Sequence, residues 1–387
     1  MVAAIDLLAR SGDLKRELVE FAEEPRYDRA FQEALTAHGD PDAFKANEEQ
    51  AIAFIDYFVL QHRLRNGKKI VEQFVASRPD LPEVERDLVL GWRDVVEGVF
   101  EVVGREGDAV VVVNLIDELT YRVRSNIGPQ TLRPLRRGSF TITRLIPIGD
   151  EWLVSGITAC FGKPQRERMC RIAAEFAWQQ PELVFRNPDK LARAWEMQRA
   201  EHDRFIRFFG ADFVVIAGCD LTERMREYFA FARDEVQADL SAQGESLRFA
   251  NQPLPEPGYG PELVDSSAVG VSCDEVEGFG FYAEFGPIED AFADPDLLGQ
   301  PRYHQHVSDY LDDDSVSPLP FRKLAERNPA RASEVFRQLL CREDFDWEHD
   351  GEKLLRQRKP THFPETRLPR TLPLSERLAP YAVSDCT

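Results

Sequence analysis

The residues best suited to chemistry lie between positions 118 and 148, where six arginines accompany a single acid, Glu118. They are Arg122, Arg124, Arg133, Arg136, Arg137 and Arg144. Guanidinium forks match phosphate and carboxylate groups. Small β-barrels also bind single-stranded nucleic acid by stacking bases on aromatic residues, and Tyr121, Phe140 and Trp152 lie nearby. This segment predicts a surface that contacts RNA or an acidic protein. The alternative is that these arginines pair with acids elsewhere in the chain.

A second candidate lies in the segment YHQHVSDYLDDDS. If residues 302–313 form a helix, His306, Asp309 and Asp313 share one face. One imidazole and two carboxylates can hold a divalent cation. Acidic clusters are also typical of a solvated helix face. We therefore predict no resident metal and keep this triad as an alternative.

Two cysteines have a context in which a thiol could react. Cys219, in VVIAGCDLTERM, lies between a predicted strand and a predicted helix, and a helix N-terminus favours a thiolate. The simpler interpretation is a helix cap at Asp220. Cys160 and Arg166 have the spacing of cysteine phosphatases, but Glu167 would sit beside the phosphate, which favours a structural cysteine at a strand end. No motif specifies a reaction, and we predict no cofactor.

The elements that would position these residues change type near residue 98. Residues 1–98 show apolar side chains at helical spacing. We expect this helical region to bury Phe54, Phe58, Val84, Leu88, Trp92 and Val95. Residues 99–163 change to short alternating runs that predict five strands, with a turn at Gly149 and Asp150. This pattern predicts a small barrel of the OB or SH3-like kind.

The rest of the chain predicts a mixed, mostly helical region. The expected parts are a helical region with one strand (164–243), a linker or long loop rich in Pro and Gly (244–265), a mixed α/β region (266–350) and an extended, basic, Pro-rich tail (351–387). Residues 287–314 carry eight acids and one base. We expect the tail to lie across this acidic band as a strap. Apolar residues must hold most of it, because exposed ion pairs contribute only about 0–1 kcal/mol each.

Composition limits the class of protein. Across 387 residues acids outnumber bases by 68 to 48, for a formal net charge of -20. General binding to nucleic acid is disfavoured, because phosphate contacts need clustered cations. Six scattered cysteines favour reduced thiols in a cytoplasm. The N-terminus lacks the pattern of a secretory signal, and no apolar run has the length of a membrane span. We expect a cytoplasmic protein of two or three domains without membrane contact.

A resemblance to a known group of proteins covers residues 54–160. It is carried by FIDYFVLQHRLRNGKKIVEQFVASRPDL, GWRDVVEGVFEVV, LIDELTYRV and RRGSFTITRLIPIGDEWLVSGI. These segments resemble uncharacterised bacterial proteins in which a helical region precedes a small β-barrel, some of which carry a SEC-C metal-binding motif. The Cys/His cluster of that motif is absent here, so no zinc site is implied. The resemblance implies the architecture and an accessory role around nucleic acid or protein handling.

These observations predict an α+β fold with a helical N-terminal region, a small five-stranded OB/SH3-like barrel and a mixed, mostly helical C-terminal region. The expected function is a non-enzymatic binding or regulatory protein of the bacterial cytoplasm, which contacts RNA or an acidic protein through the basic barrel edge. One alternative is an enzyme that uses a divalent metal at His306, Asp309 and Asp313, or the Cys219 thiol. Another is a structural interaction scaffold whose charges are all internally paired.

Overall fold

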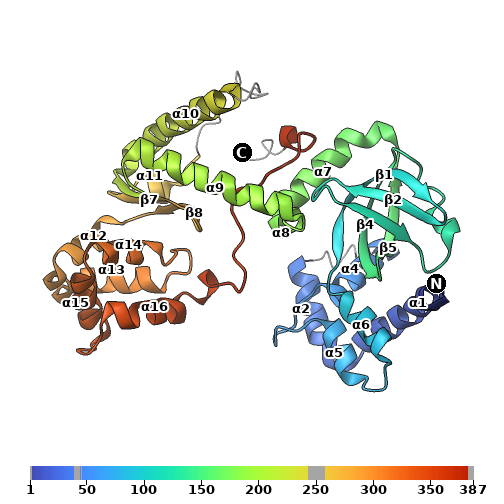
Figure 1. The fold of residues 1–387 in the computed structure, drawn as a ribbon. Helices are drawn as coiled ribbons and strands as arrows, with labels where there is room; N and C mark the ends of the chain where they lie inside the picture. The colour runs from blue at the N-terminus through green and yellow to red at the C-terminus, as the bar shows by residue number, and fades with distance from the viewer. Residues whose placement is uncertain (1, 39–43, 45, 243–257, 382–387) are drawn as a thin grey trace. The chain divides into compact units, whose positions relative to one another are not determined.

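The structure is a computed structural model that describes residues 2–38, 44, 46–242 and 258–381 (Figure 1). The chain divides into two compact units. The first comprises Met1–Leu191 and Leu372–Thr387, and the second comprises Ala192–Thr371. Both units mix helices and strands, and helices predominate near the N-terminus and in the second unit. The predicted α+β class is therefore confirmed.

The first unit begins with a helical region, as the apolar spacing predicts. Its helices are α1 (Val2–Ala22), α2 (Asp28–His38), α4 (Glu48–Leu60), α5 (Ile70–Ser77) and α6 (Glu83–Gly91). Asn47 caps α4, because its side-chain oxygen accepts hydrogen bonds from the backbone N–H groups of Glu49 and Gln50. The predicted core is confirmed except at Val84, whose side chain is 59% exposed because it lies at the surface in the first turn of α6.

Five strands follow, and they pair into a closed barrel in the order β1-β2-β3-β5-β4. The strands are β1 (Val96–Glu106), β2 (Ala109–Asn114), β3 (Thr120–Arg124), β4 (Phe140–Ile148) and β5 (Glu151–Phe161). β4 and β5 form an antiparallel hairpin whose turn contains Gly149 at a φ of 58°, a left-handed conformation that glycine adopts without strain. The barrel closes through a parallel pairing of β3 with β5.

The helices and the barrel share a hydrophobic core. Ile146 and Ile148 of β4 and Leu153 of β5 pack in the same buried cluster as Phe58 and Trp92 of the helical region. A separate cluster that includes Phe100 and Tyr121 fills the barrel itself. The barrel is therefore fixed to the helices by packing on one side.

Three helices follow the barrel: α7 (Arg166–Gln179), α8 (Pro181–Val184) and α9 (Pro188–Phe209), the last of which leads into the second unit. That unit contains an antiparallel sheet in the order β6-β7-β8, formed by Phe213–Ile216, Val269–Asp274 and Gly278–Tyr282. Its helices are α10 (Gly218–Ala242), α11 (Pro261–Val264), α12 (Gly286–Ala293), α13 (Pro301–Asp312), α14 (Leu319–Arg327), α15 (Pro329–Leu340) and α16 (Trp347–Arg358). Of the predicted linker at 244–265, residues 244–257 lie outside the described residues.

The sequence predicts an extended tail from residue 351. That prediction is wrong for its first residues, because α16 continues to Arg358. Asp346 caps this helix, and its apolar face buries Leu354 and Leu355. Packing of this face stabilises the helix despite the prolines that begin at Pro360.

Part of the predicted strap contact is present in the second unit. The buried amino group of Lys359 donates to the backbone oxygens of Tyr310, at 3.0 Å, and Asp313, at 2.8 Å. Arg358 forms an ion pair with Asp312 at 2.9 Å. The residues just after α16 therefore lie against the C-terminal end of α13, where the acidic band ends.

Within the described residues, no helix combines the length and the apolar composition needed to cross a membrane.

Candidate binding surface and cavity

The loop that carries three of the predicted arginines is held tightly against the barrel. Leu132 and Leu135 point into the barrel core, with 1% and 2% of their surface exposed. Arg105, at the end of β1, donates to the backbone oxygens of both leucines. The N–H of Gly138 also donates to the oxygen of Val102 at 2.7 Å. The loop is therefore anchored at both ends.

Because the leucines point inward, the residues between and after them point to solvent. Arg133, Arg136 and Arg137 are exposed, and within the described ranges none of the three forms an ion pair with an acid. The N–H donors of these three guanidinium groups are therefore available to bind an external anion.

The other three predicted arginines are paired inside the unit. Arg122 lies 2.8 Å from Glu151, and Arg124 binds the same carboxylate. Arg144 is largely buried and lies 2.8 Å from Glu97. The alternative of internal pairing therefore describes these three, which do not form part of an open basic face.

Two cations from a different segment extend the exposed group. Arg137, Lys163 and Arg166 line one pocket of about 530 Å³ at the side of the barrel, together with Val103 and Phe140. The one acid in its lining, Glu101, already binds Arg377 at 2.6 Å. We call Arg133, Arg136, Arg137, Lys163 and Arg166 the basic surface.

Gly138 suits its place in the loop. Its φ is 79°, a left-handed conformation that glycine adopts without strain, and a Cβ atom at this position would lie 2.4 Å from Cε of Lys163. A larger residue would therefore strain the backbone and displace the end of the Lys163 side chain.

The aromatic residues considered for base stacking expose little surface here. Tyr121 is 3% exposed in the barrel core, and Phe140 lines the basic pocket but is only 2% exposed. Trp152 packs edge-on against Tyr121, with ring centroids 5.2 Å apart. The Tyr121 hydroxyl donates to Asp117 at 2.6 Å, and burial together with this neighbouring carboxylate raises the pKa of Tyr121. These rings stabilise the barrel and do not offer a stacking platform.

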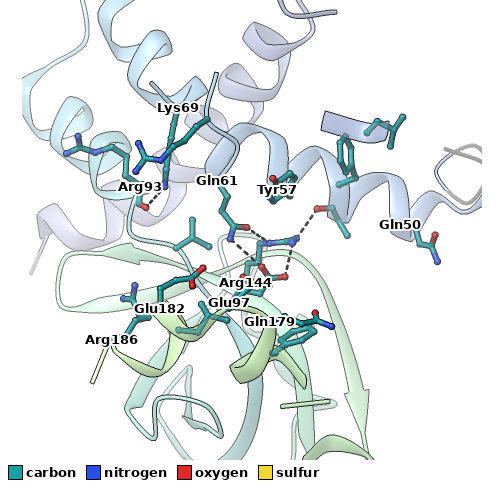
Figure 2. Close-up of a pocket in the computed structure, with 18 of the residues that line it drawn as sticks. Gln50, Tyr57, Gln61, Lys69, Arg93, Glu97, Arg144, Gln179, Glu182 and Arg186 are labelled. Carbon is teal, nitrogen blue, oxygen red and sulfur yellow. Dashed lines mark hydrogen bonds and ion pairs between the residues drawn. The ribbon is translucent and has the colours of Figure 1, made fainter. Parts of the chain in front are cut away.

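A larger cavity, of about 1040 Å³, lies in the same unit (Figure 2). Its walls come from α2, α4, the segment between α4 and α5, the segment after α6, β1, β4, α7 and α8. The lining residues are Leu35, Phe44, Gln50, Ala53, Phe54, Tyr57, Gln61, Arg63, Lys69, Arg93, Val95, Glu97, Arg144, Phe176, Gln179, Gln180, Glu182, Leu183 and Arg186.

Arg144 is the structural centre of this cavity (Figure 2). It donates to the side chain of Gln61 at 2.7 Å, to the backbone oxygen of Ala53 at 2.9 Å and to Glu97 at 2.8 Å. Gln61 and Ala53 belong to the region of α4, whereas Glu97 and Arg144 belong to the barrel. The guanidinium therefore ties the barrel to the helices, which explains why it is not free to bind a partner.

The remaining charges of the cavity are mainly positive. Arg93 lies 3.2 Å from Glu72, and Arg186 lies 2.7 Å from Asp94. Lys69 donates only to the backbone oxygen of Arg93, at 3.0 Å. Burial lowers the pKa of Lys69, and the positive charge of Arg63 lowers it further. This end of the cavity therefore holds more positive charge than its own acids neutralise.

Comparison with known families places the sequence in context. Residues 9–210, more than half of the chain, match the model of DUF7986, which is described as a family of unknown function. The chain belongs to the DUF7986 family. No curated protein and no solved structure matches it. The basic surface and every residue that lines the large cavity fall inside the DUF7986 match.

The alternative metal triad of this DUF7986 protein lies in the second unit, and its three residues have other contacts. α13 ends at Asp312, so Asp313 leaves the helical face and accepts a hydrogen bond from the N–H of Ser315. His306 contacts the backbone oxygen of Glu284 at 2.9 Å, and Asp309 accepts from Gln305. Among the described residues, no group of three or more His, Cys, Asp or Glu side chains could hold a metal ion.

The cysteine candidates also lack partners that would activate them. α10 begins at Gly218, so Asp220 lies inside the first turn and the predicted cap is wrong. Gly218 permits this start, because a Cβ atom there would lie 2.4 Å from two backbone oxygens. Cys219 is exposed, and its sulfur lies 3.5 Å from the Asp220 carboxylate. The sulfur of Cys160 lies 3.4 Å from the backbone oxygen of Pro134.

Sequence analysis missed Lys163 and Arg166 as members of the basic surface. The segment that contains them was considered only for the spacing of Cys160 and Arg166, which suggested different chemistry. Lys69, Arg93 and Arg186 were also missed, because they are far apart in sequence and only folding brings them to one cavity.

Proposed function

We propose that this DUF7986 protein is a non-enzymatic binding protein, whose basic surface contacts an acidic segment of a partner protein. One observation carries the proposal: Arg137, Lys163 and Arg166, from two separate segments, line one pocket whose single acid is occupied by Arg377. Carboxylate side chains are natural partners for such a group.

The anchoring of the loop supports this function. Binding costs less free energy when the contact residues are already ordered, because less conformational entropy is lost. Leu132, Leu135 and the hydrogen bonds of Arg105 order the loop before any partner arrives. A basic surface on a protein of net charge -20 also orients an acidic partner, since other faces repel it.

The observations favour an acidic protein segment over single-stranded RNA. Tyr121 and Phe140 are buried, and Trp152 packs edge-on against Tyr121, so these rings do not form an exposed platform for base stacking. Val103 is 37% exposed in the lining of the basic pocket, and it can receive an apolar side chain from a peptide.

The finer features predicted from the sequence belong to the same proposal. We place the protein in the bacterial cytoplasm, which keeps thiols reduced, and the described cysteines are free. We also propose that its barrel is of the OB or SH3-like kind and that it is related to the SEC-C-containing group.

The test compares two triple variants of the full-length protein. The first is Arg133→Ser, Arg136→Ser and Arg137→Ser. The control is Arg16→Ser, Arg29→Ser and Arg171→Ser, which changes the net charge equally at exposed positions of the same unit. Fluorescence anisotropy measures binding of a labelled oligoglutamate peptide and of a labelled oligouridylate, each at low and physiological salt.

We expect the peptide to bind the wild type and the control, and to bind the first variant at least about tenfold more weakly. Binding should weaken as salt rises, because the contacts are ionic. If only the RNA binds, and the first variant loses that binding, RNA replaces the acidic protein as partner. Equal binding by both variants would show that the basic surface is not the contact site.

A further inference from the structure

The large cavity of the first unit carries a separate inference, which does not depend on the basic surface. Its volume of about 1040 Å³ is at the upper end of the range for small-molecule sites, about 300–1,000 Å³. It joins cations, amides and aromatic side chains in one concave site, as ligand-binding sites do.

Two cations are held opposite each other at one end of the cavity. Arg63 and Lys69 form an antiparallel β-bridge across the turn that precedes α5, so the two residues are directly opposed. Like charges in this position repel each other. Within the part of the chain that the structure describes, the side chains donate to backbone oxygens, Arg63 to Gly67 at 3.1 Å and Lys69 to Arg93 at 3.0 Å.

Among the described residues, no acid forms an ion pair with Arg63 or Lys69, because the nearby acids bind other groups. Glu72 binds Arg93 at 3.2 Å and also accepts the backbone N–H of Lys69, while Asp94 binds Arg186 at 2.7 Å. Glu97 is occupied by Arg144 and Gln61. Glu182 is an exposed residue of the lining. An anion with two charges between Arg63, Lys69 and Arg93 would relieve the repulsion.

The rest of the cavity suits an uncharged group. Phe54, Tyr57 and Phe176 supply aromatic surface, and Gln50 and Gln179 supply amides that can both donate and accept hydrogen bonds. In Figure 2, Lys69 and Arg93 lie on one side of Arg144, whereas Gln50 lies on the other. The charged and uncharged parts of a ligand would therefore be separated.

We propose that this cavity binds a small organic phosphate, with its dianionic phosphate held by Arg63, Lys69 and Arg93 and its apolar or aromatic part against Tyr57 and Phe176. Arg144 acts as a positioning residue, because it holds Gln61 and Glu97 and thereby the wall between the two ends.

The probe is 4-methylumbelliferyl phosphate, whose binding to the full-length protein is measured by isothermal titration calorimetry. Two comparator ligands separate the contribution of the aromatic ring to the affinity from that of the phosphate charge. Inorganic phosphate lacks the aromatic group, and 4-methylumbelliferyl sulfate carries the same ring with a single charge. We expect the phosphate ester to bind at least about tenfold more tightly than either comparator.

Variants then test the residues. Arg63→Gln and Lys69→Met should each weaken binding of the phosphate ester at least about tenfold. Arg65→Gln is the matched control, because Arg65 lies in the same turn but pairs with Glu33 at 2.7 Å and does not line the cavity. It should bind as the wild type does. Arg63 is exposed, so its replacement keeps the test valid if Lys69→Met does not fold.

Three results would overturn the inference: no binding of the ester, equal affinity for the ester and either comparator, or wild-type affinity in Arg63→Gln. The Arg133, Arg136 and Arg137 triple variant should bind the ester normally. The experiments therefore distinguish a failure of the inference about the cavity from a failure of the proposed function of the basic surface.

Discussion

The amino group of Lys15 in α1 lies 2.6 Å from Oδ1 of Asp56 in α4. Both charged groups are buried, and Asp56 also accepts a hydrogen bond from Ser155 of β5 at 2.8 Å. This small network joins two helices and one barrel strand. Burial lowers the pKa of Lys15, while the carboxylate of Asp56 opposes that shift.

Removing the carboxylate should destabilise the protein strongly. Asp56→Ala leaves the amino group of Lys15 buried without a counter-charge, and such changes cost about 3–5 kcal/mol. Urea unfolding measures the loss. The control is Asp13→Ala, because Asp13 forms an exposed ion pair with Arg16, and its loss should cost about 0–1 kcal/mol. Equal stability of the two variants would contradict a buried pair.

Replacing Arg144 should lower the free energy of unfolding more than replacing Arg122, because the Arg144 ion pair is more buried. Arg144→Met leaves the largely buried Glu97 without its counter-charge and removes two hydrogen bonds from the barrel to Ala53 and Gln61 in the region of α4, so we expect a loss of about 3–5 kcal/mol. Arg122→Met breaks a more exposed pair with Glu151 and should cost about 0–1 kcal/mol. The measurement is again urea unfolding, and a larger cost at Arg122 would reverse our assignment.

Trp92 is fully buried at the end of α6, so Trp92→Ala should cost about 3–5 kcal/mol. Its indole N–H is buried and has no hydrogen-bond acceptor among the described residues. Trp92→Phe removes this unsatisfied donor as well as part of the ring, so it should cost clearly less. Thermal unfolding compares both with Trp178→Ala, which changes a residue that is 64% exposed and should alter stability by about 0.5 kcal/mol or less.

Lys359 should make stability depend on pH in the alkaline range. Burial lowers its pKa from 10.5 to about 8. Between these values the unfolded chain binds a proton that the folded chain does not, so stability rises with pH. Below about pH 8 the lysine is charged in both states, and the folded state retains the cost of desolvation.

The measurement is the free energy of unfolding of the wild type minus that of Lys359→Met, from pH 7 to pH 11. We expect this difference to increase between about pH 8 and pH 10.5. Lys353→Met changes an exposed lysine on the same helix, and its difference from wild type should not rise in this window. A flat profile for Lys359→Met would contradict the buried, shifted lysine.

The sequence by itself predicted the class of most elements in the first unit, although β1 begins at Val96, inside the segment predicted to be helical. Alternating apolar residues and the Gly149 turn predicted the hairpin of β4 and β5, because burial of one face imposes a local period. The cap formed by Asn47 and the apolar stripe of α4 likewise depend on residues that are close together in the sequence. The helix that continues to Arg358 was missed, because burial of Leu354 and Leu355 by the second unit outweighs the local signal of the later prolines.

Only the tertiary structure decided which charges are free. Arg133 and Arg144 belong to the same arginine-rich segment, yet one is exposed and the other is bound to Gln61, which lies 83 positions earlier in the chain. Asp56 interrupts an apolar helix stripe, but its partner Lys15 belongs to another helix. Such pairings depend on how distant elements pack, and no local period encodes them. For the same physical reason, the convergence of Arg137 with Lys163 and of Arg63 with Arg93 became visible only in the folded chain.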